Sequence, residues 1–85
     1  MTFTYRTRGT CSRQILIEVE GDTVGDVRFE GGCSGNLQGI AKLVKGLKID
    51  EVISRLSEIR CGMKPTSCPD QLARALTEYK ENYLD

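Results

Sequence analysis

The chain has 85 residues, which is the size of one domain, because chains divide into several hydrophobic cores only beyond roughly 250 residues. Its 12 basic and 12 acidic residues cancel, which argues against a strongly basic nucleic-acid-binding protein. A domain of this size is only marginally stable, so a cross-link, a metal or a partner subunit would help it fold. We therefore expect residues 1–85 to form a single domain, in which four cysteines are available for such a role.

The first third of the sequence predicts three β-strands, because apolar and polar residues alternate with a period of two. The alternating apolar residues are Phe3 and Tyr5, then Ile15, Ile17 and Val19, then Val27 and Phe29. Turn-forming residues separate these segments at Gly9–Ser12 and at Gly21–Asp22. The pattern predicts a three-stranded antiparallel meander.

Beyond Gly31 and Gly32 the apolar residues recur every three or four positions, which is the spacing of helices that bury one face. The three predicted stripes are Leu37, Ile40, Ala41, Val44 and Leu47; Ile49, Val52, Ile53 and Leu56; and Leu72, Leu76, Tyr79 and Tyr83. Gly46 is expected to end the first helix. This order predicts an α+β domain in which three helices pack on one face of the sheet.

The start of the third helix is marked by its own sequence. Pro69 suits the first helical turn, where no backbone donor is needed, so Ser67 or Cys68 is the expected N-cap. Asp70 or Gln71 is placed to reach back to that cap, as in a capping box.

The four cysteines are expected to lie close together. Short connections make successive elements run in opposite directions. Four positions then meet at one end of the sheet: the connection between the first two strands, the end of the third strand, the end of the second helix and the start of the third helix. Those positions hold Cys11, Cys33, Cys61 and Cys68. None of the four fits an apolar stripe, which argues against inert core cysteines.

The first residues, Met1–Arg6, lack the apolar stretch of a signal peptide, and no run approaches the ~20 apolar residues that span a bilayer. We therefore expect a cytoplasmic protein with no membrane partner. Cytosolic thiols are kept reduced, so these cysteines indicate metal binding or redox chemistry before a disulfide framework.

Thiolates favour zinc, Cu(I) or iron–sulfur clusters, and four thiolates close a tetrahedral structural zinc site. Histidine cannot contribute, because the sequence has none. Asp70 lies two residues after Cys68 and is an alternative ligand. The predicted metal ligands are Cys11, Cys33, Cys61 and Cys68. Zinc is the expected cofactor, while an iron–sulfur cluster or a redox pair of thiols remains open.

Other functions have weaker signals. An acid–base enzyme is not expected, because there is no histidine and no pair of carboxylates stands out. The glycines that could suggest a phosphate loop are Gly31, Gly32, Gly35 and Gly39. They lack the lysine and the spacing of a nucleotide site and are better explained as tight turns. The cluster of Arg6, Arg8 and Arg13 is interpreted as a solvated edge, so nucleic acid is not an expected partner.

Residues 66–70, Thr-Ser-Cys-Pro-Asp, match the signature of the TSCPD domain family, and residues 31–40, Gly-Gly-Cys-Ser-Gly-Asn-Leu-Gln-Gly-Ile, resemble the family's other motif. In larger proteins this domain resembles the C-terminal appendage of cobalamin-dependent ribonucleotide reductases, and small stand-alone members occur. The resemblance implies a link to deoxyribonucleotide and hence DNA synthesis, with a ribonucleotide reductase as a protein partner. A chain of 85 residues cannot itself supply the reductase barrel or a cobalamin site.

The sequence also resembles iron–sulfur cluster scaffolds of the NifU N-terminal type, which share the order of three strands and three helices. Cys33, Cys61 and Cys68 fall at the places of the scaffold's three cysteines. Two scaffold ligand positions differ: Gly35 replaces an aspartate, and Ser67 replaces a histidine. The resemblance therefore implies a NifU N-terminal-like fold, in which Cys11 could supply a missing ligand and close the site.

Overall fold

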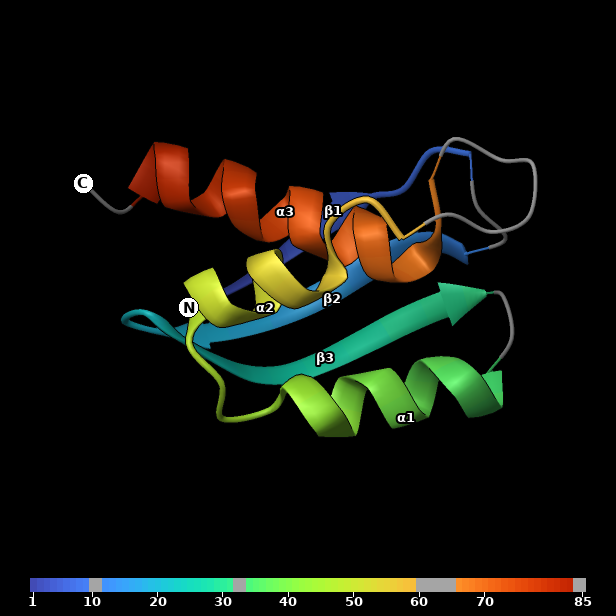
Figure 1. Ribbon diagram of the computed structural model, residues 1–85, viewed down its shortest axis with the longest axis horizontal. Coiled ribbons are helices and arrows are strands. Elements are labelled where there is room, and N and C mark those ends of the chain that lie inside the picture. The colour runs from blue at the N-terminus through green and yellow to red at the C-terminus, as the bar shows by residue number, and fades with distance from the viewer. Residues whose placement is uncertain (10–11, 32–33, 60–65, 84–85) are drawn as a thin grey trace.

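The computed structural model describes residues 1–9, 12–31, 34–59 and 66–83. The elements, shown in Figure 1, are β1 (Thr2–Arg6), β2 (Ser12–Glu20), β3 (Thr23–Gly31), α1 (Ser34–Val44), α2 (Ile49–Leu56) and α3 (Cys68–Tyr83). The predicted α+β class and the order of three strands followed by three helices are confirmed.

The sheet is an antiparallel meander with the strand order β1-β2-β3, as predicted. Its register changes twice between β2 and β3, between Ser12 and Gln14 and between Ile17 and Val19. Beside the second change, a Cβ on Gly25 would lie 3.3 Å from the backbone carbonyl of Glu18, so glycine suits this tightly packed, irregular position.

One face of the sheet forms the core. Ile15, Ile17 and Val19 are at most 1% exposed, whereas Glu18 and Arg28 point to the other face and are exposed. This is the alternation that a half-buried strand requires, because successive side chains point to opposite faces. The buried helical residues in the same core are Val44 from α1, Ile49 and Val52 from α2, and Leu72, Ala75, Leu76 and Tyr79 from α3.

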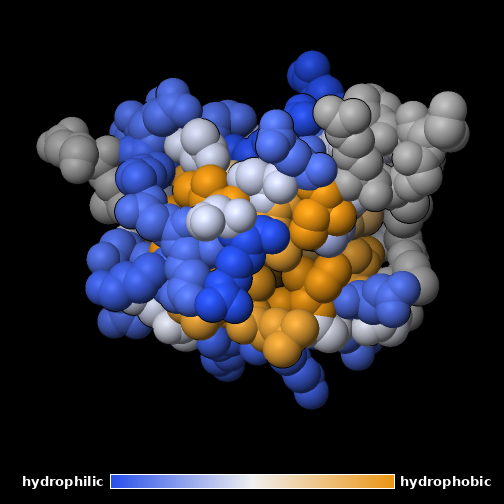
Figure 2. Space-filling view, in the orientation of Figure 1, coloured by the Kyte–Doolittle hydropathy of each residue, from blue (hydrophilic) through white to orange (hydrophobic). Residues whose placement is uncertain are grey.

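The helices therefore cover one face of the sheet, as predicted. In Figure 1, α1 follows β3, and α2 lies between α1 and α3. The rings of Phe3 and Tyr79 stack with centroids 5.2 Å apart, which fixes α3 over β1. Figure 2 shows hydrophobic side chains at the centre of this helical face with hydrophilic ones around them. The partly buried hydrophobic residues that α1 and α2 pack against the core are Ile40, Ala41, Ile53 and Leu56.

The end of α1 is set by Gly46, which adopts the left-handed φ of 87° that glycine tolerates best. Gly46 N donates to the carbonyl of Val24, and Val24 N donates to the carbonyl of Leu47, each at 2.8 Å. The prediction that Gly46 ends the helix is confirmed. The assignment of Leu47 to the helical stripe is wrong, because α1 ends at Val44 and the backbone of Leu47 pairs with β3 instead.

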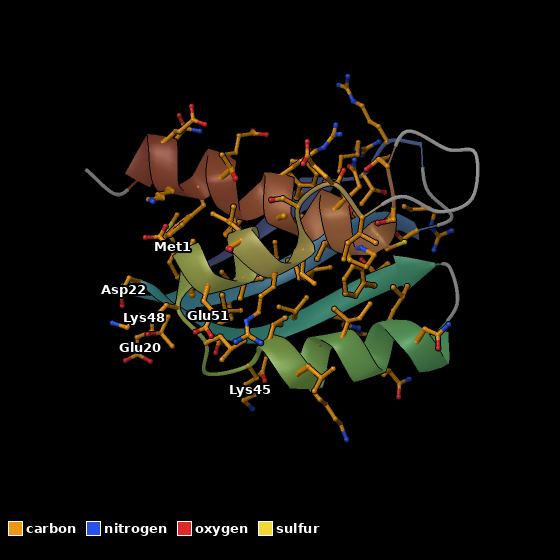
Figure 3. All side chains as sticks on the ribbon, viewed as in Figure 1. Met1, Glu20, Asp22, Lys45, Lys48 and Glu51 are labelled. Atoms are coloured by element: carbon orange, nitrogen blue, oxygen red, sulfur yellow. The ribbon has the colours of Figure 1, made fainter. Side chains whose placement is uncertain are left out.

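The turn between β2 and β3 is held against the start of α2. Ile49 N donates to the carbonyl of Asp22 at 2.8 Å, and Lys48 Nζ lies 3.0 Å from Asp22 Oδ2. The hydrogen bond and charge of Lys48 lower the pKa of Asp22 below its usual value. Figure 3 shows this pair at the end of the molecule that also holds Met1. Both side chains are largely exposed, so the ion pair contributes little to stability.

No helix in the described part of the chain combines the length and the apolar composition needed to cross a bilayer.

Candidate thiol site at the start of helix α3

Ser67 caps α3. Its hydroxyl accepts the backbone N–H of Asp70 at 3.2 Å and donates to the carbonyl of Ile59, just beyond α2. Of the two predicted caps, Ser67 is therefore confirmed, and Cys68 is the first residue of the helix. The cap satisfies one of the amides that every helix start leaves without an intrahelical partner. It also ties the start of α3 to the segment that follows α2.

Asp70 is a buried carboxylate with both oxygens bonded. Its residue is 3% exposed. Oδ1 accepts the backbone N–H of Glu58 at 2.6 Å, while Oδ2 accepts the hydroxyl of Thr66 and lies 3.0 Å from Arg74 Nε. Burial acts to raise the pKa of Asp70, but hydrogen bonds from Thr66 and Glu58 and the charge of Arg74 outweigh it and lower the pKa below its usual value. Asp70 is therefore a charged group held by three partners: the backbone N–H of Glu58, the hydroxyl of Thr66 and the guanidinium of Arg74.

Gln71 reaches back along the chain, but to a different atom than a capping box uses. Its Nε2 donates to the hydroxyl oxygen of Thr66 at 3.0 Å, and its Oε1 accepts the backbone N–H of Arg8 at 3.1 Å. Among the hydrogen bonds of the described residues, neither Asp70 nor Gln71 reaches the amide of Ser67. The predicted capping-box contact is replaced because these side chains join neighbouring segments. Gln71 thereby connects α3 to the segment that follows β1.

Cys68 is buried at the start of α3, with 7% of its surface exposed. Its Sγ lies 3.1 Å from the hydroxyl oxygen of Ser12, the first residue of β2, and either atom can donate the hydrogen bond. Ser12 is 4% exposed, and its carbonyl accepts the hydroxyl of Thr7. The sulfur at the start of α3 is therefore held against the start of β2.

Three of the four predicted cysteine ligands lie outside the described residues: Cys11, Cys33 and Cys61. Their described neighbours in the chain are close together. Ser12 pairs with Gly31 across the sheet and contacts the sulfur of Cys68, while Ser67 bonds the carbonyl of Ile59. Figure 1 shows the starts of β2, α1 and α3 and the end of β3 at one end of the molecule. The described segments that flank all four cysteines therefore converge.

A metal-binding group cannot be built from the described residues alone. Among residues 1–9, 12–31, 34–59 and 66–83, no three histidine, cysteine or carboxylate side chains cluster suitably for a metal ion. Asp70, the predicted alternative ligand, lies two residues from Cys68, but protein donors already engage both of its oxygens. These three contacts assign the carboxylate a role within the protein.

Two parts of this arrangement were not predicted from the sequence. Nothing in the local pattern singled out Ser12, whose hydroxyl contacts Cys68 across 56 positions of sequence. Thr66 was identified only as the first residue of the Thr-Ser-Cys-Pro-Asp motif, although its hydroxyl donates to Asp70 and accepts from Gln71. The one available signal was the group of polar residues at the start of the predicted helix, Thr66, Ser67, Asp70 and Gln71, which need hydrogen-bond partners when buried.

A groove of about 570 Å³ lies elsewhere, between β3 and α1. It is lined by Asp26, Val27, Arg28, Phe29, Leu37, Gln38, Ala41, Lys42 and Lys45. Lys45 Nζ lies 2.8 Å from Asp26 Oδ1, and this contact raises the pKa of Lys45. The groove shares no residue with the polar contacts around Cys68 and is a separate feature of the surface.

Comparison with known proteins supports one of the two resemblances found in the sequence. No curated protein and no solved structure matches the chain significantly, so the NifU N-terminal-like resemblance is not shown beyond the shared order of elements. Among protein-family models, the TSCPD domain matches residues 2–80, nearly the whole chain. The chain therefore belongs to the TSCPD domain family.

Proposed function

We propose that this protein is a small metal-binding module in which Cys68 and the three other cysteines hold one zinc ion. The observation that carries the proposal is the convergence of the described segments around Cys68. Ser12, which follows Cys11 in the chain, contacts the Cys68 sulfur at 3.1 Å, and Ser67 bonds the carbonyl of Ile59, two residues before Cys61.

The donor set fits zinc better than a hard cation. Four thiols are available, histidine is absent, and the nearest carboxylate, Asp70, already accepts hydrogen bonds at both oxygens. Thiolates suit zinc, and a tetrathiolate leaves no open coordination position for water. Such a site stabilises a fold and presents a surface to a partner; it does not catalyse hydrolysis. We accordingly place the protein among structural or regulatory modules.

The iron–sulfur alternative has one observation in its favour. The order of three strands and three helices is the order of NifU N-terminal-type scaffolds, and the start of α3 is where such a scaffold carries a cysteine. A scaffold holds its cluster transiently, whereas a zinc module keeps its ion. The two functions therefore differ in metal content, colour and the ease with which the metal leaves.

The family membership supports a link to deoxyribonucleotide synthesis. Because TSCPD domains resemble the C-terminal appendages of cobalamin-dependent ribonucleotide reductases, we include a ribonucleotide reductase as the proposed protein partner. The cytoplasm, where thiols are kept reduced, is the compartment that suits both this partner and a thiolate site.

Metal analysis of protein purified without oxygen tests the proposal. We expect a colourless protein with one zinc ion per chain, and loss of the zinc in Cys11→Ser and in Cys61→Ser. Lys80→Ala, which removes an exposed partner of Asp50, is the control and should retain zinc. A brown protein containing iron and sulfide would favour the scaffold. Protein without metal that forms a disulfide on mild oxidation would favour a thiol reductant.

A further inference from the structure

Asp70 joins segments that are separate in the chain. Glu58 lies beyond the end of α2, Thr66 precedes α3, and Arg74 lies one turn further along α3. A buried carboxylate is unfavourable unless donors surround it, and here each oxygen has at least one. The arrangement uses the charge of Asp70 to hold three groups together.

Glu58 shows how far this contact shapes the backbone. It has a φ of 67°, in the left-handed region that non-glycine residues rarely adopt. Its N–H points to Asp70 Oδ1 at 2.6 Å, so the carboxylate compensates the strained conformation with a charge-assisted hydrogen bond. The path of the chain after α2 therefore depends on a side chain of α3.

A second set of contacts extends from Asp70 to the segment that follows β1. Thr66, bonded to Asp70, also accepts from Gln71, and Gln71 accepts the N–H of Arg8. The same helix start presents Cys68 to Ser12 at 3.1 Å. Movement of Asp70 would loosen α3 from α2 and from the connection between β1 and β2 at once.

We propose that Asp70 is a positioning residue and not a metal ligand: it holds the start of α3 against the end of α2 and so places the Cys68 thiol beside Ser12. This inference rests on the proposed thiolate site for its effect on metal binding. Its effect on the position of Cys68 can be measured without any metal.

The substitution Asp70→Asn tests the role of the charge at nearly constant size. An amide has one acceptor oxygen, so its NH₂ group would face either the N–H of Glu58 or the donors of Thr66 and Arg74. Asp50→Asn is the matched control, because Asp50 is an exposed carboxylate that pairs with Lys80. Val52→Ala is the control for lost stability, since it truncates a fully buried residue that makes none of these contacts.

Zinc affinity is measured by competition with a chromophoric chelator at a temperature where circular dichroism shows every variant folded. We expect Asp70→Asn to bind zinc tenfold to a hundredfold more weakly, the usual effect of losing a residue that orients a ligand. Asp50→Asn should match the parent protein, and Val52→Ala should lose less than Asp70→Asn. Equal affinity in Asp70→Asn and the parent protein would overturn the proposal.

Cobalt spectra distinguish a positioning residue from a ligand. If Asp70 only positions the thiol, the cobalt-substituted Asp70→Asn protein keeps the absorption bands of the parent at the same wavelengths. Shifted bands would show that the ligand set has changed and would overturn the proposal.

Alkylation of Cys68 in the metal-free folded protein keeps the inference separate from the proposed function. We expect iodoacetamide to modify Cys68 faster in Asp70→Asn than in Asp50→Asn, as mapped by mass spectrometry. If the parent protein binds no zinc, the proposed function fails while faster alkylation still supports the positioning role. Equal alkylation rates of Cys68 in the two variants would overturn the positioning role. If Asp70→Asn does not fold, Thr66→Val removes the hydroxyl that bonds Asp70 and is judged by the same criteria.

Discussion

Gln71 provides the sharpest test of the contacts around the start of α3. Its side chain is 2% exposed and joins the hydroxyl of Thr66 to the backbone N–H of Arg8, 63 positions earlier in the chain. Gln71→Met keeps the length of the side chain and its helix propensity but removes both polar groups. The difference in stability therefore reports the two hydrogen bonds.

The expected cost follows from the surroundings of the two partners. Each lost hydrogen bond is worth about 0.5–1.5 kcal/mol, and a donor left buried without a partner costs more. Arg8 is exposed, so water can replace Gln71 at its N–H, whereas Thr66 is 3% exposed but keeps its bond to Asp70. We expect a loss of about 1–2 kcal/mol in the free energy of unfolding, which lowers the melting temperature by roughly 4–16 °C in a domain of this size.

Thermal and urea unfolding of the metal-free protein, followed by circular dichroism, measures this loss. Gln38→Met is the matched control, since Gln38 is an exposed glutamine in the middle of α1. It should change stability by less than about 0.5 kcal/mol, as surface substitutions usually do. Equal stabilities for the two variants would refute the conclusion that Gln71 holds the segment after β1 against α3.

Three further predictions follow from the structure. Because folding lowers the pKa of Asp70, its charge stabilises the fold above the unfolded pKa of 3.8, and this stabilisation is lost as the pH falls further. In acid titrations the stability difference between the parent protein and Asp70→Asn should therefore shrink between pH 5 and pH 2. A constant difference would contradict this. Ser67→Ala should lower the free energy of unfolding, measured in urea, by about 1 kcal/mol, because it removes the N-cap of α3. Ser54→Ala on the exposed face of α2 should change it very little. Equal losses in the two variants would refute the capping role of Ser67. Open space surrounds both Gly46 and Gly39, so an added methyl group tests backbone conformation alone. Gly46→Ala should destabilise the protein by about 1–2 kcal/mol, because alanine resists a φ of 87°, while Gly39→Ala inside α1 should stabilise it by about 0.5–1 kcal/mol. Changes of the same sign would show that backbone conformation is not the cause.

Local patterns were sufficient for the secondary structure. The alternation of Ile15, Ile17 and Val19 predicted a strand with one buried face, because side-chain direction in a strand depends only on whether the position is odd or even. Gly46 and Ser67 predicted a helix end and a helix start, because each acts through the backbone within four residues. These features are properties of short segments, so the sequence by itself determined them.

The roles of the polar side chains at the start of α3 were decided only by the tertiary structure. The sequence left Asp70 as either a cap or a metal ligand. Two of its partners, Thr66 and Arg74, are four residues away, but the third, Glu58, is 12 positions away, just beyond the end of α2. Gln71 was expected to reach back to the cap, yet it bonds Arg8, which follows β1 in the chain. Such contacts depend on how α2, α3 and the sheet pack together, and a buried polar group takes whichever partner that packing brings within hydrogen-bonding distance.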